Sequence, residues 1–311
     1  MIVDLVYTLL GVALLYAGAE MLVRGSVSLS QKFRVTPILV GLIVIGLGTS
    51  SPELVVSLRA AIAGSGEVAV GNVIGSNISN IALILGIGAL IRPIRANQNL
   101  LRSEVPTLIV VTLLLSLLVY NGLLTNMNGL FLILALLVYL AVTVRYHNAP
   151  AAKSLDTVSD ETGKSTFLLV SVAIAGLILL IGGAELMVTG ALGLARAFQL
   201  SEAVIGLTVV ALGTSLPELA TAIIAAVRKQ GDLILGGLIG SNILNILFVL
   251  GVTASIQSIE LVDIRLQDLL LMCFLAVILW PMLRTGYVVS RFEGGVLLLV
   301  YSGYLIHLFM R

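Results

Sequence analysis

Long apolar segments, separated by short polar ones, make up almost all of this 311-residue chain. An α-helix needs roughly 20 mostly apolar residues to cross a bilayer, and ten segments approach or exceed that length. They cover about residues 4–23, 36–62, 68–91, 104–121, 127–146, 166–189, 201–227, 232–257, 266–284 and 292–310. The pattern therefore predicts an all-α membrane protein with ten transmembrane helices.

Two parts of the chain resemble each other at a constant offset of 165 residues. Residues 41–53 match residues 206–218 at nine of thirteen positions. Residues 71–86 match residues 236–251 at ten of sixteen positions. Such similarity indicates that the protein consists of two repeats of one ancestral unit.

The polar stretch around 147–165 divides the ten helices into two groups of five. This predicts a first five-helix repeat over 1–146, a cytoplasmic linker over 147–165 and a second repeat over 166–311. Because five is an odd number, the second repeat must cross the membrane in the opposite direction. Inverted repeats of this kind are common in secondary transporters.

Composition agrees with a membrane protein, since 59% of the residues are hydrophobic and only 11% are charged. Soluble domains have about 25% charged residues. The formal net charge of +1 gives no indication of nucleic-acid binding. The single cysteine, Cys273, excludes a disulfide framework within the chain.

Lysine and arginine predict the orientation, because they are enriched in cytoplasmic loops. With both termini outside, thirteen of the seventeen basic residues lie on the cytoplasmic side. These are Arg24, Lys32, Arg34, Arg92, Arg95, Arg102, Arg145, Lys153, Lys164, Arg228, Lys229, Arg284 and Arg291.

The second and seventh helices each contain a proline that interrupts a regular helix. Pro52 and Pro217 lack an N–H, and their rings clash with the carbonyl four residues earlier, at Gly48 and Gly213. Both prolines belong to the same string, GTSxPE, at 48–53 and 213–218. We therefore expect both helices to break there, at a depth where freed carbonyls can serve as ligands.

Oxygen-bearing side chains recur at matching positions of the two repeats. In a helix, residues four apart share a face, so these side chains converge if helices 2, 3, 7 and 8 meet. The set comprises Thr49, Ser50, Glu53, Ser76 and Asn80 in the first repeat, and Thr214, Ser215, Glu218, Ser241 and Asn245 in the second. A carboxylate within the membrane is costly, at roughly 2.5–3.5 kcal/mol on insertion scales. Two at matching positions indicate a cation site.

The ligand chemistry points to a hard cation. Oxygen ligands and two carboxylates suit Ca²⁺, which takes six to eight oxygens, and Na⁺ also prefers oxygen. The hydroxyls and amides have an alternative interpretation as interhelical hydrogen bonds. Gly71, Gly75, Gly236 and Gly240 form small-xxx-small patterns that predict close packing of helices 3 and 8.

Glu20 and Glu185 form a third matched pair of acids, near the ends of helices 1 and 6. One interpretation is an acid that reaches water at a helix end and pairs with an arginine, such as Arg24 four residues after Glu20. The other is a residue of the vestibule through which ions enter.

The chain resembles the prokaryotic sodium/calcium exchanger branch of the calcium/cation antiporter superfamily. GTSSPE at 48–53, GTSLPE at 213–218, GNVIGSNISNI at 71–81 and GGLIGSNILNI at 236–246 carry the resemblance. It implies that helices 1 and 6 slide across a core that binds ions near the membrane midplane. It also implies that the ten side chains above, with the backbone carbonyls of Gly46 and Ala211, are ligands.

A departure from the family pattern concerns Asn245, where some archaeal members have Asp. The site then has two acids rather than three, which leaves the driving ion open. The resemblance implies Ca²⁺/Na⁺ antiport in a bacterial inner membrane, with no cofactor and no obligate protein partner. Alternatives are Ca²⁺/H⁺ antiport on the same fold, a cation channel and an intramembrane enzyme. Against an enzyme, the membrane core offers no histidine base, because His147 and His307 are expected in or near loops and interfaces.

Overall fold

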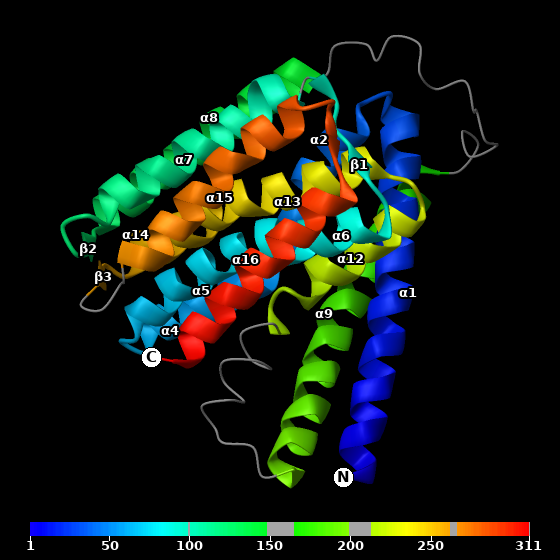
Figure 1. The fold of residues 1–311 in the computed structure, drawn as a ribbon, viewed down its shortest axis with the longest axis horizontal. Coiled ribbons are helices and arrows are strands. Elements are labelled where there is room, and N and C mark those ends of the chain that lie inside the picture. The colour runs from blue at the N-terminus through cyan, green and yellow to red at the C-terminus, as the bar shows by residue number, and fades with distance from the viewer. Residues whose placement is uncertain (99, 148–164, 199–212, 262–265, 311) are drawn as a thin grey trace.

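The computed structural model describes residues 1–98, 100–147, 165–198, 213–261 and 266–310, and these residues are mostly helical (Figure 1). The helices of the first half are α1 (Ile2–Phe33), α2 (Pro37–Val40), α3 (Gly46–Thr49), α4 (Ser51–Ile62), α5 (Gly66–Ser79), α6 (Leu85–Ile91), α7 (Val105–Leu118) and α8 (Asn126–His147). Those of the second half are α9 (Thr166–Ala197), α12 (Leu216–Val227), α13 (Gly231–Leu244), α14 (Gly251–Ile256), α15 (Leu266–Arg284) and α16 (Arg291–Phe309). Short π-helices join several of them: η1 (Gly41–Ile45), η2 (Asn80–Ile84), η3 (Leu100–Glu104) and η6 (Asn245–Leu250).

Seven helical segments of the described chain are long and apolar enough to cross a membrane. They are Ile2–Phe33, Gly66–Ile91, Leu100–Leu118, Asn126–Arg145, Thr166–Leu194, Gly231–Ile256 and Leu266–Arg284. The bent pair Pro37–Thr49 and Ser51–Ile62 makes an eighth if it is one span. The chain is therefore a largely helical membrane protein.

Two of the ten predicted helices are not among these segments. The helix expected over 201–227 is described only from Leu216 to Val227, because 199–212 lie outside the described residues. The last helix, α16, has 19 residues but begins with charged Arg291 and Glu293, which lowers its hydropathy. A count of ten spanning helices remains a prediction.

Helix starts follow from local sequence. Thr36 caps α2 by accepting a hydrogen bond from the Leu39 N–H, and Pro37 occupies the first helical position, where no N–H is needed. Ser290 and Glu293 form a reciprocal capping box at the start of α16. These caps satisfy N–H groups that the first turn leaves without a partner.

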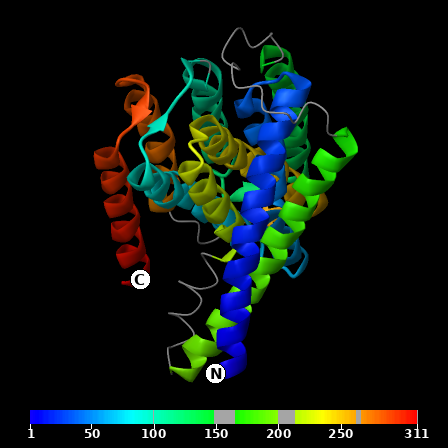
Figure 2. The ribbon, with the colours of Figure 1, turned by 90° about the vertical axis from the view of Figure 1, so that its right-hand side faces the viewer.

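Helices α1 and α9 form a long pair that extends beyond the other helices (Figure 2). Glycines bring the two backbones into contact. A Cβ atom on Gly18 would lie 2.6 Å from the Gly176 carbonyl oxygen, and one on Gly11 would lie 2.7 Å from that of Gly183. Small residues allow such close packing in membranes, where hydrophobic burial does not drive association.

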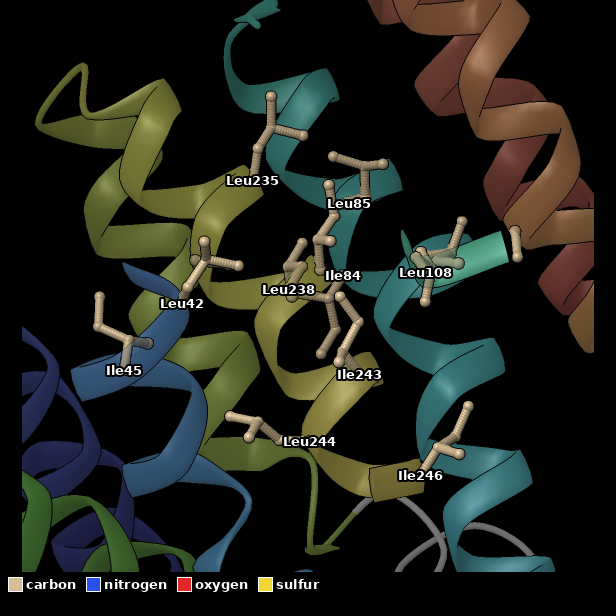
Figure 3. Close-up of a cluster of buried hydrophobic side chains, with 14 of the residues drawn as sticks. Leu42, Ile45, Ile84, Leu85, Leu108, Leu235, Leu238, Ile243, Leu244 and Ile246 are labelled. Carbon is tan, nitrogen blue, oxygen red and sulfur yellow. The ribbon is translucent and has the colours of Figure 1, made fainter. Parts of the chain in front are cut away.

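The core of the remaining bundle surrounds α13, whose residues from Leu233 onward are all buried. Figure 3 shows Leu42, Ile84, Leu238 and Ile243 interlocking at its centre. A Cβ atom on Gly240 would lie 2.7 Å from the Leu42 Cα. One on Gly236 would meet the Ile38 carbonyl oxygen at the same distance, so α13 contacts the backbone of α2 and η1.

The predicted close packing is therefore confirmed for Gly236 and Gly240. By the repeat, the residues that correspond to their contacts Ile38 and Leu42 are Ala203 and Leu207, which lie outside the described residues. The packing of Gly71 and Gly75 therefore stays a prediction.

Two short antiparallel strand pairs repeat the internal similarity. Strand β1 (Ile94–Arg95) pairs with β4 (Val288–Val289), and β2 (Leu123–Leu124) pairs with β3 (Ile259–Glu260). Strand β3 lies 165 residues after β1, and β4 lies 165 residues after β2, so each pair contains one strand from each repeat. The two pairs lie at opposite ends of the bundle (Figure 1).

Candidate cation site

The first GTSxPE string lies at a break between two helices. Helix α3 ends at Thr49, and α4 begins at Ser51 with Pro52 in its first turn, which needs no N–H from proline. Ser50 has φ −80° and ψ 1°, and the segments on either side are bent by 40°. Glu53 therefore lies in the first turn of a restarted helix.

The second string adopts the same local conformation. Ser215 has φ −88° and ψ 4°, and α12 begins at the next residue, with Pro217 and Glu218 in its first turn. The backbone at 199–212 lies outside the described residues, so a preceding helix and its angle to α12 are not described.

The two glutamates are buried at the centre of the bundle. Glu53 has no exposed surface and Glu218 has 3%. They are close enough to interact electrostatically, and no salt bridge within the described residues neutralises either. A buried carboxyl group must be protonated or compensated by a cation, and no cationic side chain among the described residues compensates this pair.

Hydroxyl groups from both repeats surround the carboxylates. The Ser76 hydroxyl donates to Glu53 Oε1 at 3.5 Å, and the Thr49 and Ser241 hydroxyl oxygens lie 3.3 Å apart. Thr49 of the first repeat and Glu218 of the second line the same small cavity.

Four asparagines form a hydrogen-bonded belt across the two repeats. The Asn80 Nδ2 donates to Asn242 Oδ1 at 2.8 Å, and the Asn245 Nδ2 donates to Asn77 Oδ1 at 3.1 Å. The Asn77 and Asn242 amides also donate to each other's backbone carbonyls, at 3.2 and 3.4 Å. The nitrogens of Asn80 and Asn245 are therefore occupied, which leaves their oxygens available.

Asn80 and Asn245 also begin the π-helices η2 and η6. A π-helical turn is rare and is often found at functional sites, because it departs from the i→i−4 ladder. Both predicted amide ligands thus lie at the same backbone irregularity of the two repeats.

Six buried oxygen atoms of the predicted ligands have no hydrogen-bond donor within the described part of the chain. They are Ser50 Oγ, Glu53 Oε2, Asn80 Oδ1, both Oε atoms of Glu218, and Asn245 Oδ1. Buried polar atoms are nearly always satisfied, so a concentration of unsatisfied acceptors fits coordination of a cation. A small cavity of about 10 Å³, lined in part by Thr49, Glu218 and Ser241, lies beside them. Its volume is about that of one water-sized sphere.

Of the two predicted backbone carbonyl ligands, only that of Gly46 lies within the described residues. The Gly46 carbonyl oxygen accepts a hydrogen bond from the Ser50 N–H at 3.1 Å, and its second lone pair remains available. Ala211 lies outside the described residues.

Three residues of this region were not predicted. Asn77 and Asn242 hold the two predicted amides, and the Ser79 hydroxyl lies 3.3 Å from that of Ser215. Asn77 and Asn242 occupy matching positions in the two GSN strings, which is the signal that identifies them. Ser79 has no such signal, because its counterpart is Leu244.

Glu20 lies outside this cluster. It pairs with Arg24, at 2.5 Å, and accepts a hydrogen bond from the Arg228 Nε at 2.7 Å. The predicted pairing of Glu20 with arginine is therefore confirmed, but its predicted place near the end of helix 1 is wrong, because α1 continues to Phe33. Glu185, its counterpart, is exposed on α9.

Comparisons with known proteins show which family the chain resembles over most of its length. Residues 3–145 and 168–310 match the family described as sodium/calcium exchanger protein. The inner membrane protein YrbG of Escherichia coli is 35% identical over 262 residues, which is 81% of this chain and 80% of YrbG. The sodium/calcium exchanger MaX1 of Methanosarcina acetivorans is 29% identical over 350 residues, 99% of each chain.

A solved structure shares the whole fold. The sodium-calcium exchanger NCX_Mj, in a crystal soaked with Na⁺ and Sr²⁺, superimposes with a TM-score of 0.87 at 31% identity, and the match covers 98% of both chains. The family consists of exchangers, not enzymes. On its sequence, its fold and its paired motifs, the chain belongs to the sodium/calcium exchanger protein family.

Proposed function

We propose that the protein is a secondary antiporter that moves Ca²⁺ across a bacterial inner membrane in exchange for Na⁺. The observation that carries the proposal is a cluster of six buried oxygens, between the two repeats, that have no donor among the described residues. Three of these atoms belong to the paired glutamates, whose two charges match those of one Ca²⁺. Neutral oxygens complete the coordination that a hard cation requires.

The proposed ligands are those predicted from the sequence. Glu53 and Glu218 supply the charge, and the hydroxyl and amide oxygens of Thr49, Ser50, Ser76, Asn80, Thr214, Ser215, Ser241 and Asn245 supply neutral positions for Ca²⁺ and for several Na⁺. The carbonyls of Gly46 and Ala211 complete the set. Occupation by one kind of ion would exclude the other, because both need the same carboxylates.

Alternating access is proposed to follow from the two repeats. The packing of α1 and α9 as a separate pair supports movement of this pair as a unit across the bundle. The equivalent strand pairs at opposite ends support an inverted arrangement of two five-helix repeats, ten helices in all, with a second break at Ser215.

Transport in proteoliposomes tests the driving ion. Vesicles loaded with Na⁺ and diluted into Na⁺-free buffer are expected to accumulate ⁴⁵Ca²⁺, because eight neutral side-chain ligands offer more positions than a proton site needs. The parallel condition is an imposed proton gradient without Na⁺. Uptake that follows the proton gradient and ignores Na⁺ would replace this proposal with Ca²⁺/H⁺ exchange.

Cysteine labelling tests the orientation. In a Cys273→Ala background, cysteines introduced at Ser154 and Met310 are expected to react from opposite sides of the membrane, with Met310 outside. The distribution of lysine and arginine is the reason. Reaction of both with an impermeant reagent applied outside intact cells would contradict the five-plus-five inversion.

The amide ligands give a separate prediction. Asn80→Ala and Asn245→Ala each remove one oxygen without changing the charge of the site, so Ca²⁺ affinity is expected to fall about tenfold, as for loss of a bond to a charged group. Asn121→Ala, in an exposed turn, is the control. The apparent affinity is measured from ⁴⁵Ca²⁺ uptake. Unchanged affinity in both variants would assign these amides to helix packing alone.

A further inference from the structure

A basic hollow opens at the end of the bundle that carries β1. It has a volume of about 530 Å³ and lies where α12 ends and α13 begins. Its charged lining residues are Arg92, Arg95, Lys229 and Asp232. A second hollow of about 420 Å³ adjoins it, shares Arg92 and adds Arg291.

The three cations of the first hollow are not neutralised within the described residues. None of Arg92, Arg95 and Lys229 forms a salt bridge there, and Asp232 alone opposes them among the lining residues. The described lining residues of the hollow therefore carry a net positive charge. Helix α13 starts beside it without a side-chain cap, so the partial positive charge of its first turn adds to this field.

The backbone conformation at Lys229 would suit glycine better than lysine, so a lysine at this position points to a role for its side chain. Lys229 has φ +64°, a left-handed conformation that favours glycine. The matching position of the first repeat, at the end of α4, is Gly64, with φ +79°. Lysine thus replaces the residue that this turn prefers, at the point where the turn borders the hollow.

The matching end of the other repeat has no such charge. The counterparts of Arg92, Arg95 and Lys229 are Gln257, Glu260 and Gly64. The two ends share a backbone plan, as their strand pairs demonstrate. The cations are therefore a property of this end and not of the repeated fold.

We propose that this hollow binds the phosphoryl group of an anionic lipid headgroup. Arginine is suited to phosphate because its guanidinium presents several donors in one plane, and lysine adds a point charge. The hollow lies at the ends of the spanning segments Gly66–Ile91 and Gly231–Ile256, at the level where the hydrocarbon layer gives way to headgroups. This end is also the one that the basic residues predict to be cytoplasmic, where anionic lipids attract basic segments.

Native mass spectrometry of the full-length protein tests the proposal. The protein is incubated in detergent with equimolar phosphatidylglycerol and phosphatidylcholine, and the retained lipids are counted. Wild-type protein is expected to retain phosphatidylglycerol preferentially. Lys229→Gly and Arg92→Gln are each expected to weaken this retention about fivefold, as for loss of one basic residue at a membrane surface.

Two controls separate binding from folding and from general charge. Lys229→Gly restores the residue found in the first repeat, so its melting temperature without added lipid should equal or exceed that of the wild type while lipid retention falls. Arg59→Gln removes an exposed positive charge from α4 and should leave retention unchanged.

Two results would overturn the proposal. Equal retention of phosphatidylglycerol by wild type, Lys229→Gly and Arg92→Gln would mean that these cations do not bind lipid and serve only to orient the chain in the membrane. Displacement of the retained lipid by inorganic phosphate would assign the hollow to free phosphate instead of a headgroup. Persistence of the lipid in the presence of inorganic phosphate supports the headgroup.

Discussion

Replacing either buried glutamate by glutamine is expected to abolish Ca²⁺ exchange. Glu53→Gln and Glu218→Gln keep the shape of the side chain but remove one of the two charges that compensate a divalent cation. Removing one partner of a buried charge pair costs about 3–5 kcal/mol, so flux should fall by at least about a hundredfold. The measurement is ⁴⁵Ca²⁺ uptake by proteoliposomes containing equal amounts of protein.

The matched control is Glu260→Gln, which removes an acid from an exposed position of β3. It should leave Ca²⁺ flux unchanged, and all three variants should keep the melting temperature of the wild type within a few degrees. Near-normal flux in Glu53→Gln or Glu218→Gln, at normal expression, would remove the paired carboxylates from the site.

A methyl group added to Gly240 is expected to destabilise the protein strongly. Gly240→Ala places a Cβ atom 2.7 Å from the Leu42 Cα and 2.8 Å from the Leu42 carbonyl oxygen. These are backbone atoms that cannot rotate away, so α13 must move. Overpacking of this kind costs about 1–3 kcal/mol, and the backbone contact places this variant near the upper value. Thermal unfolding in detergent measures the effect.

An exposed glycine within α16, Gly303, provides the control for this substitution. A Cβ atom on Gly303 would meet no described atom within 4 Å. Gly303→Ala should therefore be neutral or slightly stabilising, because alanine favours a helix more than glycine does. Equal destabilisation by both substitutions would contradict the close backbone contact at Gly240.

The glutamates were predictable from sequence because a charge within an apolar segment is costly and occurs here twice in the same string. The break at Ser50 followed from proline chemistry in the same way. Both inferences depend on residue types whose physical demands are fixed wherever they occur. The prediction of ten spanning helices depends on hydropathy alone, which identifies a helix less reliably than the proline and glutamate signals do. Helix α16 is an example, because charged residues in its first turn lower its hydropathy.

The asparagine belt and the glycine packing required the structure. Spacing places Asn77, next to Ser76, on a different side of α5 from the predicted ligands, and only the position of Asn242 shows that it supports them. Likewise, a GxxxG pattern alone did not identify Ile38 and Leu42 as the backbone that Gly236 and Gly240 contact. Periodicity identifies the face of a helix but not what lies opposite it.

The belt between Asn77 and Asn242 has a consequence for the ancestry of the chain. Each amide bonds the backbone of its own counterpart in the other repeat, so the contact needs only two copies of one sequence related by a two-fold axis. A half-length ancestral polypeptide, inserted in both orientations, would already have formed this contact as a homodimer. If two such copies were joined by gene fusion, only a connecting segment had to be added to keep this self-complementary contact.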